Sequence, residues 1–340
     1  MKSHHAWTRR SLLQAAALGA AALTAQRPGW TAAMAPMIQK PIPSTGERLP
    51  VIGLGTIWYR DANYAVLKAV IQRFFALGGT VIDTASTYGE SEGVVGRALE
   101  ELGLRERIFL ATKFDGGHMP TQTPEQRIAA RTGPGPGGVD GPPQGIERPD
   151  ADGVGGREAW QRSLQRLRTT RLDLQQVHNM GDVEALMPVM QEQKAAGKVR
   201  YIGVSAAAAQ PARLIEVLQK HPIDFVQLDF SLGNRAADKA GALQACREHK
   251  AAVLINLPLG RNTMLRKVQG KPLPASAAEI DASSWAQYFL KYVVSHPAVT
   301  CALPGTSSLA HLEDDLRGGR GRLPDAAQRR RMEADWDALG

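Results

Sequence analysis

The alternation of short apolar runs with amphipathic helical patterns constrains the fold of this chain more than any other feature. Eight runs rich in β-forming residues occur in order, and each is followed by a stretch with helical periodicity. Those runs are 51–55, 80–83, 108–113, 172–178, 199–205, 223–230, 252–256 and 299–303. Apolar strands separated by helices imply a parallel sheet with right-handed crossovers. Eight such units predict an α/β fold, a closed (β/α)8 barrel of the TIM type.

An open doubly wound sheet is the main alternative fold. Such a sheet normally has a Gly-rich turn and a helix directly after its first strand, and residues 53–56 (Gly-Leu-Gly-Thr) lack the third glycine and the helix. Before the first run, residues 36–50 carry Ser-Thr-Gly at their middle, which predicts an N-terminal β-hairpin. The 340 residues are enough for one barrel of roughly 250 residues with additions.

The first 25 residues differ in character from the rest of the chain. Residues 8–13 read Thr-Arg-Arg-Ser-Leu-Leu, an Ala/Leu-rich run follows, and no acidic residue occurs before Glu47. This combination predicts that residues 1–35 are a twin-arginine signal peptide with a short linker. We therefore expect the chain to use the twin-arginine export machinery, to be periplasmic and to keep no stable membrane anchor after cleavage. A buried N-terminal helix is the alternative.

The formal charge of +8 does not indicate a nucleic-acid partner. Lys2, Arg9 and Arg10 supply three of the positive charges, and basic residues elsewhere alternate with acids instead of forming a stripe. The two cysteines, Cys246 and Cys301, could pair in an oxidising compartment. Because one is predicted in a helix and the other in a strand, two buried free thiols are favoured.

Residues 36–340 form the predicted barrel domain, and one segment interrupts its rhythm. Residues 116–156 are rich in Gly and Pro, contain no aromatic residue and form a long loop after the third strand. Loops of this length in compact domains are usually functional or disordered. The position after that strand favours a lid over the catalytic end of the barrel, and an insertion without a catalytic part is the alternative.

Polar residues occur at or just beyond the carboxyl ends of most predicted strands. In an α/β barrel these ends converge on one rim, where active sites form. The residues that share this placement are Asp83, Lys113, His178, Ser205, Gln227, Asn256 and Thr306. One polar strand end means little, but a succession of them predicts a constructed pocket.

Asp83, Tyr88, Lys113 and His178 form the predicted catalytic set, and no metal site is predicted. A free tyrosine is a poor acid at neutral pH because its pKa is about 10. An ammonium at Lys113 would lower that pKa, and Asp83 would keep Lys113 charged. His178 would direct a hydrogen bond at a substrate oxygen. Such a site protonates a carbonyl as hydride arrives, and the hydride requires a cofactor. Taken singly, the Asp83–Lys113 pair could be structural and His178 a core histidine.

The order and spacing of these motifs resemble the aldo-keto reductase family. The resemblance covers residues 42–316 and rests on 51–56, 82–92, 111–113, 163–178, 197–205 and 295–306. It implies reduction of a small-molecule aldehyde or ketone, or the reverse reaction, with NADPH as cofactor, NADH being possible. Tyr88 would be the general acid.

The resemblance also implies which residues surround the ligands. Ser205 and Gln227 would hold the nicotinamide carboxamide, and Trp58 and His178 would contact the substrate. The residues implied at the cofactor are Thr56, Asp83, Ser205, Gln227, Asn256, Leu257, Leu259, Gly305, Thr306, His311 and Asp315.

Four positions of this sequence depart from the family pattern. Ala206 stands where the family often has Asn, and Asn256 replaces the usual aromatic residue, as in one branch of the family. His311 and Asp315 replace a common Arg and Asn near the adenosine. Because a charged Asp315 would repel a 2′-phosphate, we expect weaker discrimination for NADPH over NADH than the family usually shows.

Two other functions are open at this stage. A Schiff-base lyase could use Lys113 as its nucleophile, since barrel aldolases also place a lysine at a strand end. A sensor or partner subunit would bind the cofactor without turning over a carbonyl.

Overall fold

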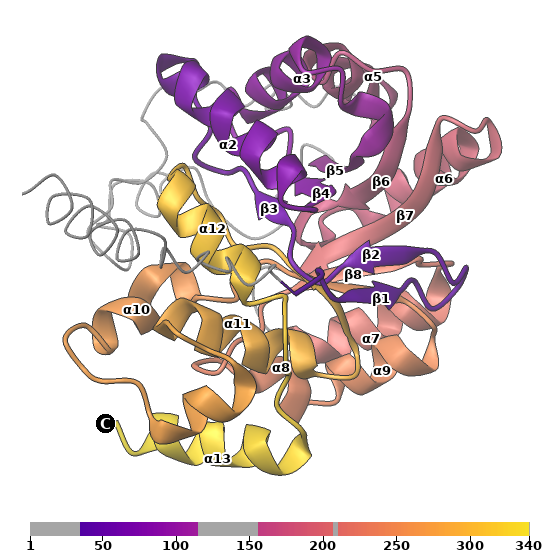
Figure 1. Ribbon diagram of the computed structural model, residues 1–340. Helices are drawn as coiled ribbons and strands as arrows, with labels where there is room; N and C mark the ends of the chain where they lie inside the picture. The colour runs from indigo at the N-terminus through magenta and orange to yellow at the C-terminus, as the bar shows by residue number, and fades with distance from the viewer. Residues whose placement is uncertain (1–34, 115–155, 207–209, 340) are drawn as a thin grey trace, which may run out of the picture. The chain divides into compact units, whose positions relative to one another are not determined.

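The computed structural model describes residues 35–114, 156–206 and 210–339 (Figure 1). The predicted signal peptide and the Gly/Pro-rich segment therefore lie outside the described residues, apart from Ala35 and Gly156. The described residues from Pro36 onward form one compact unit. No helix in the described part of the chain is long and apolar enough to cross a membrane.

Eight parallel strands form the main sheet, each paired with its neighbours in sequence. They are β3 (Leu54–Gly55), β4 (Val81–Asp83), β5 (Phe109–Phe114), β6 (Leu172–Val177), β7 (Val199–Ala206), β8 (Phe225–Leu228), β9 (Ala252–Ile255) and β10 (Val299–Ala302). The two edges meet, because Ile52 pairs with Ala302 and Gly55 with Gly305 in parallel bridges. A Cβ on Gly55 would lie 3.2 Å from the Leu303 carbonyl oxygen, so glycine permits this close approach. The predicted (β/α)8 barrel is confirmed.

Helices follow the strands and cover the outside of the sheet (Figure 1). The α-helices are α2 (Tyr64–Ala76), α3 (Ser91–Glu101), α5 (Gly156–Arg166), α6 (Val183–Ala195), α7 (Pro211–Lys220), α8 (Ala236–Lys239), α9 (Ala242–Glu248), α10 (Thr263–Lys267), α11 (Trp285–Ser295), α12 (Leu309–Arg317) and α13 (Ala326–Asp337). The 3-10 helices among the described residues are η1 (Asp61–Asn63), η2 (Arg105–Arg107), η3 (His178–Met180), η4 (Gly260–Asn262) and η5 (Ala275–Ile280).

The helical periodicity read from the sequence marks the buried faces. Helix α2 buries Leu67, Val70, Ile71 and Phe74, which recur at helical spacing and form one apolar face. Full burial of one such side chain stabilises the fold by about 1.5–3 kcal/mol. Packing of these stripes, more than intrinsic propensity, therefore keeps the helices on the sheet. Both cysteines are buried free thiols, as expected.

The barrel interior is apolar at its N-terminal end. Phe109, Tyr201 and Phe225 meet there with ring centroids 5.3–5.9 Å apart. The predicted hairpin, β1 (Gln39–Pro41) paired antiparallel with β2 (Arg48–Pro50), contributes to this end of the barrel. Its turn places the Thr45 hydroxyl 3.0 Å from the Tyr201 hydroxyl. The hairpin prediction is confirmed.

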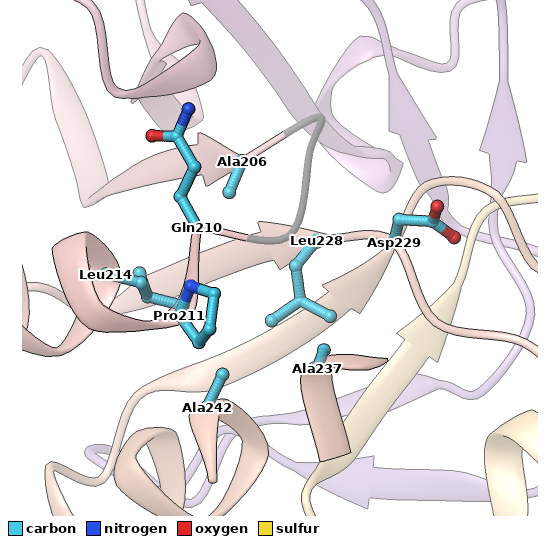
Figure 2. A pocket seen from close by; sticks show the side chains of 8 residues that line it. All are labelled: Ala206, Gln210, Pro211, Leu214, Leu228, Asp229, Ala237 and Ala242. Carbon is cyan, nitrogen blue, oxygen red and sulfur yellow. The ribbon is translucent and has the colours of Figure 1, made fainter. Parts of the chain in front are cut away.

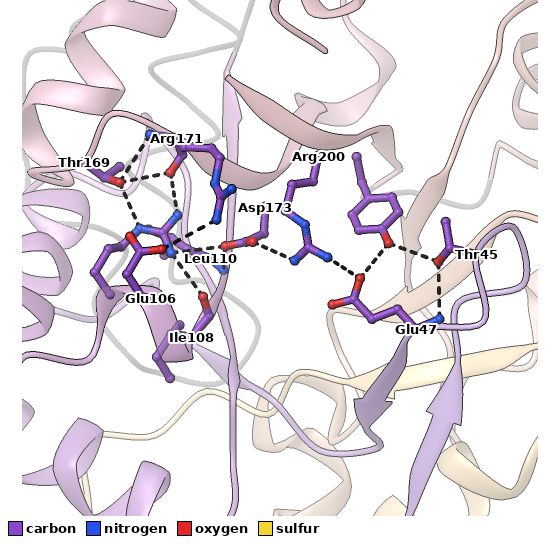
Figure 3. Close-up of polar contacts among 11 residues, drawn as sticks. Thr45, Glu47, Glu106, Ile108, Leu110, Thr169, Arg171, Asp173 and Arg200 are labelled. Atoms are coloured by element: carbon purple, nitrogen blue, oxygen red, sulfur yellow. Dashed lines mark hydrogen bonds and ion pairs between the residues drawn. The ribbon is translucent and has the colours of Figure 1, made fainter. Parts of the chain in front are cut away.

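A charged network ties the hairpin to the strands (Figure 3). Asp173, 4% exposed at the start of β6, accepts hydrogen bonds from Leu110 N at 2.9 Å, Arg105 Nη1 at 3.2 Å and Arg200 Nη1 at 3.0 Å. Arg200 also pairs with Glu47 of the hairpin. This end of the molecule is thus fixed by structural contacts, which leaves the C-terminal rim for the site.

Candidate active site

The polar centre of the rim is a buried ion pair. Lys113 Nζ donates to Asp83 Oδ2 at 2.6 Å and to the Thr84 carbonyl oxygen at 2.8 Å, and both charged residues are at most 3% exposed. The pair forms because Asp83 is the last residue of β4 and Lys113 lies near the end of the adjacent β5. Because both groups are buried, water does not compete for their hydrogen bonds, and the attraction between the two charges is strong in this low-dielectric setting. Each side chain therefore holds the other in position.

Tyr88 and His178 lie against this pair. The Lys113 ammonium is 5.1 Å from the Tyr88 ring centroid, and the Tyr88 and His178 rings meet edge to face at 5.9 Å. His178 Nδ1 is 3.2 Å from the hydroxyl of Thr87, the residue directly before Tyr88. This contact holds the imidazole against the turn that carries Tyr88. Both rings are half-buried. The structure therefore brings all four predicted catalytic residues together.

The electrostatics of the pair and the phenol follow from burial. Burial disfavours the Lys113 ammonium, but its interactions with Asp83 and Tyr88 outweigh this effect, and the pKa of Lys113 lies above its ordinary value. Burial also raises the pKa of Tyr88 above 10, although Lys113 acts to lower it. The sequence predicts the lowering of this pKa by Lys113 but not the larger influence of burial. At neutral pH the phenol therefore carries its proton.

A second hydrogen-bond network supports Asp83 from below. Thr56 Oγ1 donates to the Asp83 carbonyl oxygen at 2.9 Å, and Ser91 Oγ donates to Thr56 Oγ1 at 2.8 Å. The Thr84 hydroxyl is 2.9 Å from Ser91 Oγ. Thr56, fully buried, thus has a structural partner at the position where a cofactor contact was predicted.

The turn that carries Trp58 is fastened to the turn that carries Tyr88. Arg60 Nη1 donates to the carbonyl oxygens of Tyr59 at 2.7 Å and Tyr88 at 3.2 Å, and Asp61 N donates to Glu90 Oε2 at 2.7 Å. Trp58 itself is 43% exposed. A large aromatic surface beside the turn that carries Tyr88 suits contact with a small molecule.

The residues predicted to hold the nicotinamide lie on consecutive strands. Ser205 pairs with Gln227 in the sheet register, and its hydroxyl accepts a hydrogen bond from Asn179 N at 2.9 Å. Gln227 Nε2 donates to Asp83 Oδ2 at 3.1 Å. Asn256, directly after β9, keeps its Oδ1 buried without a partner among the described residues. Leu257 and Leu259 are half-buried in the following segment.

The residues predicted near the adenosine divide into accessible and buried groups. Gly305 and His311 are exposed and Thr306 is half-buried, whereas Asp315 on α12 is 5% exposed. Burial, with a smaller effect from Asp314, raises the pKa of Asp315 to about 8. Near neutral pH this carboxyl is therefore largely uncharged, which removes most of the repulsion that the sequence comparison implied.

The structure adds residues that sequence reasoning missed. Arg261 lies near enough to Tyr88 and Asp229 to lower the pKa of both groups, although burial keeps both above their ordinary values. Gln176 donates to Gln227 within the barrel. The signal for Asp229 was its place directly after a strand, and for Gln176 its place two residues before His178.

A small apolar pocket lies beside the rim, between the ends of β7 and β8 and the helices α7, α8 and α9 (Figure 2). Its lining residues are Ala206, Gln210, Pro211, Leu214, Leu228, Asp229, Ala237 and Ala242. Ala206 and Leu228 follow Ser205 and Gln227 directly, so their side chains point to the opposite face of the strands. No cluster of potential metal ligands occurs among the described residues.

The Aldo/keto reductase family model matches residues 51–330. Methylglyoxal reductase YeaE of Escherichia coli is 30% identical over 297 residues, which span 82% of this chain and 89% of that protein. Aldo-keto reductase yakc of Schizosaccharomyces pombe, whose name specifies NADP(+), is 29% identical over 226 residues. That match spans 63% of this chain and 59% of the relative.

Solved structures show the same fold. An aldo/keto reductase from Klebsiella pneumoniae in complex with NADP and acetate superimposes with a TM-score of 0.65 at 24% identity, covering 86% of this chain and 93% of that one. A Klebsiella pneumoniae aldo-keto reductase in complex with NADPH gives a TM-score of 0.67 at 24% identity, with 88% and 96% covered.

Proposed function

The chain belongs to the aldo/keto reductase family, and from this membership we propose that it reduces an aldehyde or ketone with NADPH, or runs the reverse reaction, with Tyr88 as the proton donor. One observation carries the proposal. The Asp83–Lys113 ion pair at 2.6 Å lies against the Tyr88 ring, with His178 at the edge of the same ring. The names of the relatives support carbonyl reduction and NADP.

A nicotinamide cofactor fits the polar atoms of this rim. Asp83 Oδ1 and Asn256 Oδ1 are buried acceptors without partners among the described residues. A carboxamide and ribose hydroxyls present the donors that such acceptors lack. Gly305 and His311 offer accessible surface at the adenosine end, and NADH is a possible second cofactor. When bound, the nicotinamide supplies the hydride that no side chain carries.

The protein's own residues manage the proton. The Tyr88 hydroxyl delivers its proton to the carbonyl oxygen, and His178 directs a hydrogen bond at the same oxygen. Lys113, kept charged by Asp83, stabilises the phenolate left on Tyr88. Because burial favours the protonated phenol, Tyr88 starts each reduction loaded with its proton.

The same geometry disfavours the lyase alternative. A Schiff-base nucleophile must be a neutral amine. Lys113 donates to two oxygen acceptors, and its raised pKa keeps it an ammonium. Reduction of a carbonyl uses that charge, whereas imine formation would have to remove it.

Substitution of Tyr88 by Phe tests the proposal. We expect kcat/KM for carbonyl reduction, with methylglyoxal as the first substrate assayed, to fall by roughly 10²–10⁴ because only the proton donor is lost. NADPH affinity, followed by fluorescence titration, should be nearly unchanged. Tyr288→Phe on α11 is the matched control and should retain activity.

Two outcomes would contradict this proposal. Turnover of Tyr88→Phe at the wild-type rate would exclude Tyr88 as the acid. A wild-type protein that binds NADPH but reduces no aldehyde or ketone would favour the sensor or partner subunit. Export of the folded enzyme to the periplasm is part of the proposal and rests on residues 8–13; cell fractionation would test it.

A further inference from the structure

Four buried side chains form one continuous hydrogen-bonded chain across the barrel interior, and one of them, Gln176, has no part in the mechanism above. Gln176 Nε2 donates to Gln227 Oε1 at 3.0 Å, and Gln227 Nε2 donates to Asp83 Oδ2 at 3.1 Å. Lys113 Nζ donates to the same carboxylate oxygen at 2.6 Å. None of the four residues is more than 3% exposed, so water does not replace any of these bonds.

The carboxylate sets the direction of the whole chain. The Asp83 carboxylate, which forms the ion pair with Lys113, can only accept hydrogen bonds. Gln227 must therefore present its NH2 group to Asp83, which turns its carbonyl oxygen toward Gln176. Gln176 must in turn present its own NH2 group. With the Gln227 amide reversed, two oxygen acceptors would face each other in a buried site, which is unfavourable.

The strand register explains how Gln176 reaches this position. On β6, Gln176 lies beside Lys113 of β5 on one side and Gly203 of β7 on the other. Gly203 shares the inward face of β7 with Tyr201 and Ser205, because alternate residues of a strand point the same way. Gly203 has no side chain on that face, and Gln176 reaches past β7 to Gln227 on β8, two strands away.

Packing alone does not account for an amide at position 176. Gln176 Oε1 is buried and has no partner among the described residues. An apolar side chain of similar size would avoid that unfavourable burial. The part of Gln176 that makes a contact is its NH2 group, and that contact fixes Gln227. The polar group thus has a consequence for the site that a methionine could not supply.

We propose that Gln176 is a positioning residue for the reaction, fixing the Gln227 amide so that Gln227 orients the Asp83 carboxylate and Lys113 faces Tyr88. The inference rests on the proposed function. Without Gln176, Gln227 Oε1 loses its donor and the amide is able to turn away from Asp83. With one hydrogen bond fewer, the Asp83 carboxylate then attracts Lys113 more strongly, and its negative charge is less offset near Tyr88. This makes the Tyr88 phenol a weaker acid.

The matched pair of variants is Gln176→Met and Gln175→Met. Gln175 is also fully buried on β6, and neither atom of its amide has a partner among the described residues. It lies on the opposite face of the strand, so the same chemical change there leaves the chain of hydrogen bonds intact. Unfolding temperatures of both variants confirm that each is folded.

Two readouts separate this inference from the proposed function. In the protein without cofactor, the NMR signal of the Lys113 ammonium nitrogen, assigned with Lys113→Met, should move in Gln176→Met and stay in place in Gln175→Met. In the reductase assay, kcat of Gln176→Met should fall roughly tenfold, because the Gln227 amide turns away and its hydrogen bond to the charged Asp83 carboxylate is lost. KM should change little, and the alkaline limb of the kcat–pH profile should move to higher pH.

Each result decides the matter. An unmoved Lys113 signal in Gln176→Met, or an equal movement in both variants, would overturn the inference even if the enzyme reduces carbonyls. Wild-type kcat and pH profile in Gln176→Met would overturn it as well. If the wild type reduces no carbonyl but the Lys113 signal moves only in Gln176→Met, the reaction is wrong and the positioning of Lys113 by Gln176 stands.

Discussion

Replacing Asp83 by Asn removes one charge from the centre of the site while keeping the shape of the side chain. The oxygen of the introduced amide could still accept the hydrogen bond from Gln227, so the main loss is the ion pair with Lys113 at 2.6 Å. Lys113 remains 1% exposed and cannot recover the interaction from water. The perturbation therefore leaves an ammonium buried without its counter-charge.

The cost follows from that geometry. Removing one partner of a buried ion pair typically destabilises a protein by about 3–5 kcal/mol. For a domain of this size each kcal/mol corresponds to roughly 2–4 °C, so the unfolding temperature should fall by roughly 10 °C. Burial is the largest influence on the pKa of Lys113 and acts to lower it. Without Asp83 that influence dominates, and Lys113 loses its proton more readily.

This release of the proton gives the prediction a pH signature. With its folded-state pKa depressed, Lys113 in the variant binds fewer protons in the native state than in the unfolded state. The free energy of unfolding of the variant therefore rises with pH, up to the pKa of lysine in the unfolded state, near 10.4. In the wild type the pKa of Lys113 is raised, so the stability that Lys113 contributes is lost only when the pH rises above the unfolded-state pKa of lysine. The difference in unfolding temperature between the two proteins should narrow between pH 6 and pH 9.

Thermal unfolding followed by circular dichroism at pH 6 and pH 9 measures this difference in unfolding temperature. In a separate assay, kcat/KM of Asp83→Asn for carbonyl reduction should fall by at least roughly 10². Glu106→Gln is the control, because its side chain is 81% exposed and its pair with Arg171 spans 3.6 Å. Such surface pairs contribute little. A loss below about 1 kcal/mol in Asp83→Asn, equal at both pH values, would refute the idea that Asp83 keeps Lys113 charged.

Two further predictions concern carboxyl groups outside the catalytic set. Asp173→Ala should lower the free energy of unfolding by about 3–5 kcal/mol. The substitution leaves Leu110 N buried without its acceptor, and Arg105 and Arg200 lose the carboxylate that they share. An unchanged midpoint of urea unfolding would contradict this prediction. Asp315→Asn should stabilise the protein with an advantage that grows from pH 4 to pH 8, because the raised pKa of about 8 favours the neutral carboxyl in the fold. The upper bound is about 6 kcal/mol, and an advantage independent of pH would show that Asp315 is not desolvated.

The barrel was predictable because its signals are local and repeated. Each βα unit is recognised by an apolar run followed by an apolar helix face, such as the one formed by Leu67, Val70, Ile71 and Phe74. Eight such units in succession are compatible with few sheet topologies. The close placement of Asp83 and Lys113 was predictable for a related reason. Strand ends of a parallel barrel meet at one rim, so Asp83 and Lys113 had to be neighbours once the strands were assigned.

The charge states of the site were not predictable in the same way. The sequence places a lysine near Tyr88, but the pKa of the phenol depends on how much surrounding protein excludes water, and burial has the larger effect. Asp315 follows the same rule. Its position in a motif suggested a charge facing a phosphate, whereas the packing of α12 buries it and raises its pKa to about 8.

By itself the sequence determined the order of the elements, the hairpin and the set of polar residues gathered at the rim, because periodicity and strand alternation act over a few residues. Only the tertiary structure decided that Gln176 on β6 reaches across Gly203 to Gln227, and that Gln227 reaches Asp83. Those contacts join side chains up to 144 positions apart. Their geometry depends on barrel closure and on exclusion of water, and no local pattern of residues encodes either one.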